Sequence, residues 1–206
     1  MMNAEDVAAC FTRPDGSYHF ARWGRPIAPI VFGVEDATLE IVKGAIEALA
    51  VVSGHKLAET DPELGANLMF FFFREWDELL DVPDLGRLIP DLPALVARIK
   101  AAGANQYRSF RFDNAGAIQA AFVFVQMDAA MSKLPAEDLA LAQVVQVMLL
   151  WSEQSFAQRS PLAKAPDGTV LLRPEISALI AASYDPVMPV ASEDASHALR
   201  LAARMG

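Results

Sequence analysis

The sequence has few of the residues on which several common kinds of site depend. Cys10 is its only cysteine, so the chain can form neither an internal disulfide nor a metal site built from several thiolates. Its 17 Lys and Arg residues are scattered and are outnumbered by 26 Asp and Glu residues, which gives a formal net charge of −9. Proteins bind nucleic-acid phosphates and anionic membrane surfaces through clustered basic residues. We therefore expect no nucleic-acid partner.

Signals for phosphate loops, membrane spans and export are also missing. Neither of the glycine-rich phosphate-loop patterns occurs, and no apolar run has the length of a transmembrane helix. Val7-Ala8-Ala9-Cys10 looks like a lipoprotein cleavage box, but Glu5 and Asp6 stand where an export signal would be basic or apolar. The compartment stays open: we expect a cytoplasmic protein as the chain is written, and a periplasmic or lipid-anchored one if a signal peptide was removed.

The apolar content is ample for one core. Hydrophobic residues make up 53% of the 206 positions, which fits a single domain. Turn signals in residues 1–25 predict an irregular N-terminal arm, followed by one domain over residues 26–206. Residues 27–34 read as a strand, and apolar spacing predicts a helix from the N-cap Asp36 to Ser53. The four-phenylalanine run within residues 66–73 predicts a strand covered on both faces.

The second half predicts a hairpin followed by a buried helix. Residues 107–113 and 117–127 are strand-like and are separated by a short loop that contains Gly116. From Leu139 to Trp151 the only polar residues are Gln143 and Gln146, so we expect the longest helix to lie there, in the core. Further helices are expected at 92–102, 174–183 and 192–204. The fold class that follows is α+β: a mixed β-sheet with a hairpin packed on a long central helix, and C-terminal helices.

Several short segments resemble an uncharacterised bacterial lipoprotein family with a zincin-like layout, the fold of many metallopeptidases. The matching segments are Arg22-Trp23, residues 116–125, the helix around Gln146, Ser160-Pro161, Leu179-Ile180 and Tyr184-Asp185-Pro186. The resemblance spans most of residues 20–190. It implies a sheet-edge hairpin that leads into a helix bearing a His-Glu-Glu…Gln signature.

That signature is absent here. Aligning Gln146 with the family's glutamine places the His-Glu pair on Leu141 and Ala142, and residues 135–153 contain no histidine in any register. A zinc-binding helix needs two histidines four residues apart, with a glutamate as general base. We therefore expect no metal and no catalytic residue on this helix. His19, His55 and His197 are isolated in sequence, and whether they meet at a metal stays open.

Two functions remain as hypotheses. The first is a non-catalytic protein on a degenerate zincin-like frame, which binds or assembles with an unknown protein or small molecule and has no cofactor. Its candidate pocket residues are Gln143, Gln146, Arg108, Tyr184, Asp185 and His197. The alternative is a hydrolase whose site lies outside the central helix and draws on Arg108, Glu153, Tyr184, Asp185 and His197. A homodimer through the apolar C-terminal helices is also open.

Overall fold

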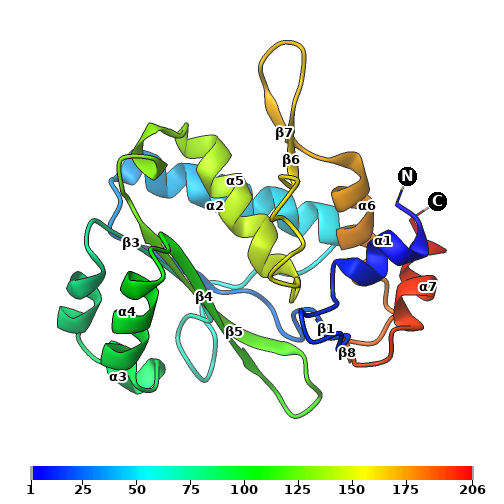
Figure 1. Cartoon of the computed structure of the whole chain (residues 1–206), viewed down its shortest axis with the longest axis horizontal. Helices are drawn as coiled ribbons and strands as arrows, with labels where there is room; N and C mark the ends of the chain where they lie inside the picture. The colour runs from blue at the N-terminus through cyan, green and yellow to red at the C-terminus, as the bar shows by residue number, and fades with distance from the viewer. Residues whose placement is uncertain (1, 206) are drawn as a thin grey trace.

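The computed structural model describes residues 2–205 as one mixed α+β structure (Figure 1). The helices are α1 (Ala4–Ala9), α2 (Asp36–Ser53), α3 (Leu85–Leu88), α4 (Leu92–Ala101), α5 (Ala136–Met148), α6 (Pro174–Ser183) and α7 (His197–Ala202), with 3₁₀ turns η1 (Trp76–Asp81) and η2 (Met131–Lys133). The strands are β1 (Phe20–Ala21), β2 (Pro29–Phe32), β3 (Leu68–Phe73), β4 (Gln106–Phe112), β5 (Ile118–Gln126), β6 (Leu162–Lys164), β7 (Val170–Leu172) and β8 (Ala191–Ser192).

The main sheet has four strands in the order β2-β3-β5-β4. β2, β3 and β5 are mutually parallel, and β4 pairs antiparallel with β5 at one edge. The predicted mixed sheet and its β4–β5 hairpin are therefore confirmed. Parallel strands need a crossover connection, and α2 provides it between β2 and β3, whereas η1, α3 and α4 lie between β3 and β4.

Helices cover both faces of this sheet (Figure 1). α2 and α5 lie on one face, and η1, α3 and α4 lie on the other. The phenylalanine run of β3 shows why, since side chains alternate across a strand. Phe70 and Phe72 enter the core on the α2–α5 side, and Phe71 and Phe73 enter the core on the α4 side. All six residues of β3 are buried, as predicted for a doubly covered strand.

The predicted irregular arm over residues 1–25 was wrong for its first part. Residues 4–9 form α1, which is closed by a capping box between Asn3 and Asp6. β1 pairs with β8 near the other end of the chain, and α1 packs beside α7, so the two ends of the chain lie close together (Figure 1). Phe11 and Trp23 are fully buried. Turn residues in this segment therefore connect packed elements.

The predicted helix up to Trp151 was too long, because α5 ends at Met148. Leu149 is extended and bridges to Arg22, and the Leu150 N–H donates to the Ala21 carbonyl at 2.9 Å. Backbone pairing with the N-terminal segment thus replaces the last helical turn. α2, with 18 residues, is longer than the 13-residue α5, which corrects the expectation that α5 is the longest helix.

Aromatic side chains bind the carbonyls that this ending leaves free. Two donors are distant in sequence, Trp23 Nε1 to Val147 at 2.8 Å and Tyr184 Oη to Met148 at 2.7 Å, and the third, Trp151 Nε1 to Val145 at 2.9 Å, follows the helix directly. The C-terminal end of α5 is therefore anchored by tertiary contacts.

Other departures from the predicted elements are local. The N-cap of α2 is Glu35 and not Asp36, and its side chain makes no capping hydrogen bond. The last helix begins at His197 and not at residue 192, because Ala191 and Ser192 pair with β1. No helix within residues 2–205 combines the length and the apolar character that crossing a membrane requires.

Candidate functional site

Three polar side chains meet between the edge strand β4 and the helix α5. The Arg108 guanidinium donates through Nη2 to Gln143 Oε1 at 2.6 Å and to Gln106 Oε1 at 3.0 Å. Gln143 Nε2 donates to the same Gln106 oxygen at 2.7 Å, which closes the triangle. Gln143 is 2% exposed, whereas Gln106 and Arg108 are half-buried, so the cluster reaches from the interior toward the surface at the sheet edge. We refer to Gln106, Arg108 and Gln143 as the β4–α5 cluster.

The sequence period of each element explains the cluster. Even-numbered residues of β4 face α5, since Arg108 lies opposite Val123 and Phe110 opposite Ala121 in the core on that side. Gln106 and Arg108 are therefore neighbours on one face. Gln143 is on the buried stripe of α5, between Leu139 and Val147. The packing of α5 on the sheet then brings its amide to the two β4 side chains.

The charge of Arg108 is not balanced. No carboxylate of residues 2–205 forms an ion pair with it, although eight other ion pairs occur. Its Nε is buried and has no hydrogen-bond partner. Burial lowers the pKa of Arg108 to about 10, because the charged form loses hydration and no anion compensates. The side chain stays cationic at neutral pH, and an anion placed beside it would recover part of this cost.

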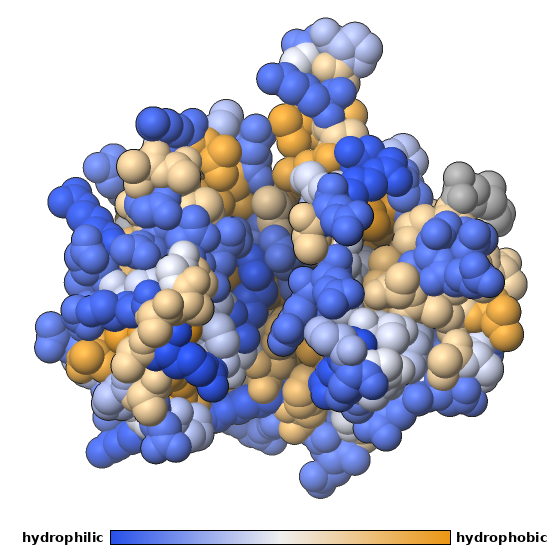
Figure 2. All heavy atoms as spheres, viewed as in Figure 1, coloured by the Kyte–Doolittle hydropathy of each residue, from blue (hydrophilic) through white to orange (hydrophobic). Residues whose placement is uncertain are grey.

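The backbone next to this cation is also accessible for pairing. The Gln126 N–H donates to the Asn105 carbonyl at 2.8 Å, and bonded residues alternate along an antiparallel ladder. Gln106, Arg108 and Phe110 consequently direct their backbone N–H and carbonyl groups away from β5. No strand within residues 2–205 pairs with that side of β4. Figure 2 shows the surface hollowed in its centre, between the half that carries β4 and the half that carries the segment following α5.

Gln146 belongs to the same helix but not to the cluster. It is half-buried, and its Nε2 donates to the Ala142 carbonyl of its own helix at 3.0 Å. That bond is local to the helix and the side chain is half-buried, so the amide can turn toward a neighbour without leaving a fully buried group unpaired. Of the six candidate pocket residues, the structure thus brings Arg108 and Gln143 into contact and places Gln146 one turn further along α5.

The other three candidates serve as structural contacts elsewhere. Tyr184 is bonded to the end of α5, and burial raises its pKa. Asp185 forms an ion pair with Arg204 at 3.1 Å. His197 is 2% exposed and bonds Tyr18 Oη through Nδ1 at 2.9 Å. With Glu153 exposed in the segment after α5, the residues considered for a hydrolase are distributed over separate regions.

The histidines make three unrelated contacts. His19 lies 3.6 Å from Glu193, His55 bonds the Arg25 carbonyl at 2.8 Å, and His197 bonds Tyr18. Within residues 2–205, no group of three or more His, Cys, Asp or Glu side chains is arranged to hold a metal ion.

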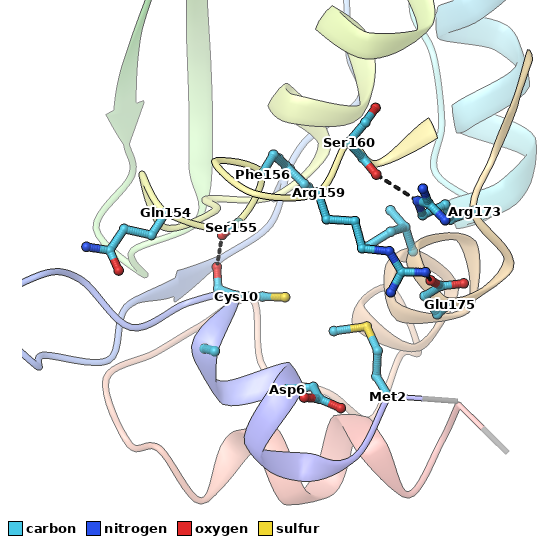
Figure 3. Close-up of a pocket in the computed structure, with 12 residues that line it drawn as sticks. Met2, Asp6, Cys10, Gln154, Ser155, Phe156, Arg159, Ser160, Arg173 and Glu175 are labelled. Atoms are coloured by element: carbon cyan, nitrogen blue, oxygen red, sulfur yellow. Dashed lines mark hydrogen bonds and ion pairs between the residues drawn. The ribbon is translucent and has the colours of Figure 1, made fainter. Parts of the chain in front are cut away.

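A cavity of about 590 Å³ lies between α1, residues 154–160 and the start of α6 (Figure 3). Arg159 reaches across it to Glu175 at 2.8 Å, and the Cys10 thiol points into it. Burial, together with the charge of Asp6, raises the pKa of Cys10 to about 11, so the thiol is protonated and weakly nucleophilic. Of the other charged groups in the lining, Arg173 donates through Nε to the Ser160 carbonyl at 2.8 Å and the Asp6 carboxylate accepts the Asn3 N–H at 2.9 Å, so each charged side chain already has a partner within the described chain.

Gln106 is the member of the β4–α5 cluster that the sequence did not indicate. Its alternation with Arg108 was visible, but its contact with Gln143 depends on how α5 packs across the sheet. Comparisons with protein-family models, with curated proteins and with solved structures gave no match.

Proposed function

We propose that this protein is a non-catalytic binding protein on a zincin-like frame, and that it binds a carboxylate-bearing ligand at Arg108. The observation that carries the proposal is a half-buried arginine whose Nε is buried without a hydrogen-bond partner and which has no carboxylate partner within the described chain. A charge that is desolvated without compensation lowers the stability of the free protein. A bound carboxylate would supply the missing acceptor, and charge-assisted hydrogen bonds to it are among the stronger ones.

The surrounding elements favour an extended ligand. A peptide can add to an exposed sheet edge through main-chain hydrogen bonds, while pockets beside the edge select its side chains. Here the outward backbone groups of Gln106, Arg108 and Phe110 offer the edge, and the Arg108 side chain lies on the same strand. The absence of a His-Glu pair on α5 and the order hairpin-then-helix support the non-catalytic, zincin-like part of the proposal.

Binding of a short acidic peptide tests the proposal. The probe is a hexapeptide that alternates Val and Glu, and its control replaces each Glu by Gln. We expect the acidic peptide to shift backbone amide resonances of β4 and the Gln143 side-chain amide in an NMR titration. Arg108→Met should weaken binding about tenfold or more, since a hydrogen bond to a charged group contributes about 1.5–3 kcal/mol.

Arg111→Met is the matched control, because Arg111 lies on the same strand but its guanidinium packs over Phe122 on the opposite face. It should change the affinity by less than about twofold, as expected for a charge on the far side of the sheet. Equal binding of the Glu and Gln peptides, or unchanged binding by Arg108→Met, would overturn the proposal. If acetate shifts the same resonances but the acidic peptide does not bind, the carboxylate site stands and the extended ligand is rejected.

A further inference from the structure

A second cavity, of about 250 Å³, lies at the carboxyl ends of the parallel strands. Gly33 and Val34 follow the end of β2, Phe72 lies near the end of β3, and Met127 follows the end of β5. The amino-terminal parts of α2 and α5 complete its wall. In open α/β sheets this edge is the usual place for ligands, because the strand ends diverge there and helices start around a crevice.

The wall is apolar. It includes Val34, Val42, Phe72, Met127, Leu139 and Ala140, contributed by separate elements. The polar side chains among the lining residues are Thr38 and Glu35, and no Lys, Arg or His lines it. An engineered apolar cavity of about 150 Å³ is large enough to bind benzene, so this one is large enough for a somewhat larger molecule.

We propose that this cavity binds an uncharged, mainly apolar small molecule with at most one hydrogen-bonding group, which Thr38 meets. Entry of such a molecule removes apolar surface of both partners from water. A carboxylate is disfavoured, since it would be desolvated beside Glu35 without a cation in the lining. Glu137 and Asp138 in the first turn of α5 add negative charge near the same helix end, and Lys133 is the basic side chain closest to it in sequence.

The site does not depend on the β4–α5 cluster. None of Gln106, Arg108 and Gln143 lines this cavity, and the ligand class is different. Failure of hexanol to bind this cavity would therefore leave the proposal for Arg108 standing, and failure of the acidic peptide to bind at Arg108 would leave the proposal for this cavity standing.

The experiment is an NMR titration of the whole chain with 1-hexanol, and with hexanoate as the charged analogue of equal chain length. Hexanol should shift resonances of Val34, Val42 and Thr38 in a saturable way, and its methylene protons should show cross-relaxation with the methyl groups of Val34 and Val42. Hexanoate should bind about tenfold more weakly, which corresponds to a difference of about 1.4 kcal/mol.

Two alanines of α5 provide a matched pair of variants. Ala136 lines the cavity and Ala142 does not, and both are half-buried. Ala136→Leu should weaken hexanol binding about tenfold by occupying the space, whereas Ala142→Leu should change it by less than about twofold. Hexanoate binding as tightly as hexanol would overturn the ligand class. Absence of cross-relaxation in the unmodified protein would overturn the site, whether or not Ala136→Leu folds.

Discussion

The buried imidazole of His197 makes the stability of the protein dependent on pH. The centroid of its ring lies 4.3 Å from that of the Phe20 ring. Its Nδ1 forms a hydrogen bond with Tyr18 Oη, and its Nε2 is buried without a hydrogen-bond partner. Burial, with a smaller effect from Arg200, lowers the pKa of His197 from 6.5 to about 4, and Asp194 offsets only part of this. Protonation would place a charge in this contact, so the folded protein resists it.

The magnitude follows from the pKa difference. A pKa that is lower in the folded than in the unfolded state means that the unfolded chain binds more protons between pH 6.5 and pH 4. Acidification through this window therefore favours unfolding. The difference between the two pKa values corresponds to about 3 kcal/mol of unfolding free energy, and about 2 kcal/mol of this stability is lost by pH 4.5. Stability is retained above pH 6.5, the side on which both states are neutral.

Urea unfolding at steps between pH 7 and pH 4.5 measures this loss, with His197→Gln as the variant. The variant is expected to be less stable at pH 7, because it disturbs a packed contact, but its stability should fall much less over the same range. His55→Gln is the control. Burial also lowers the pKa of His55, so this variant should remove only the part of the pH dependence that His55 contributes and should keep the part that comes from His197. A stability of the unmodified protein that stays flat down to pH 4.5, or the same pH slope in His197→Gln, would refute the reasoning.

Two further predictions concern the packing around α5 and β3. Trp23→Phe should lower the free energy of unfolding by about 3 kcal/mol in urea denaturation, because it leaves the buried Val147 carbonyl without its donor and opens a gap in the core; a loss below about 1 kcal/mol would contradict this anchoring. Gly33→Ala should be destabilised by about 3 kcal/mol in thermal unfolding, since Gly33 has φ +81° and a Cβ there would lie 1.9 Å from the Phe72 carbonyl oxygen. Gly65→Ala, at φ +72° with nothing within 4 Å, is the control and should lose about 1 kcal/mol.

Local patterns predicted the elements whose partners are close in sequence. The helix from residue 36 to Ser53 and the hairpin around Gly116 follow from apolar spacing and turn chemistry, and both are present. The doubly covered β3 also followed, because four consecutive phenylalanines require apolar surroundings on both faces. These features do not depend on knowing the rest of the fold.

The features that were missed depend on distant pairing. The end of α5 at Met148 is decided by the strand-like contact of Leu149 with Arg22, more than 100 residues away. Pairing of this kind also explains why the N-terminal residues, predicted as an irregular arm, are packed into the core. At the site, Arg108 and Gln143 were both candidates, but their contact required the packing of α5 on β4, which apolar spacing does not encode.

A comparison of two half-buried arginines explains why Arg108 and not Arg22 is the proposed binding residue. Both lack a carboxylate partner and have a buried Nε without a hydrogen-bond partner within residues 2–205, and burial lowers the pKa of both. Arg22 donates to the carbonyls of Trp23 and Met188 and lies over the Tyr184 ring at 5.4 Å, so its charge links the N-terminal segment to α6 and the chain after it. Arg108 has only two glutamine amides that could bond each other without it. Beyond these contacts between β4 and α5, Arg108 makes no other side-chain hydrogen bond within residues 2–205, and this is why we propose it as the residue that binds an anionic ligand.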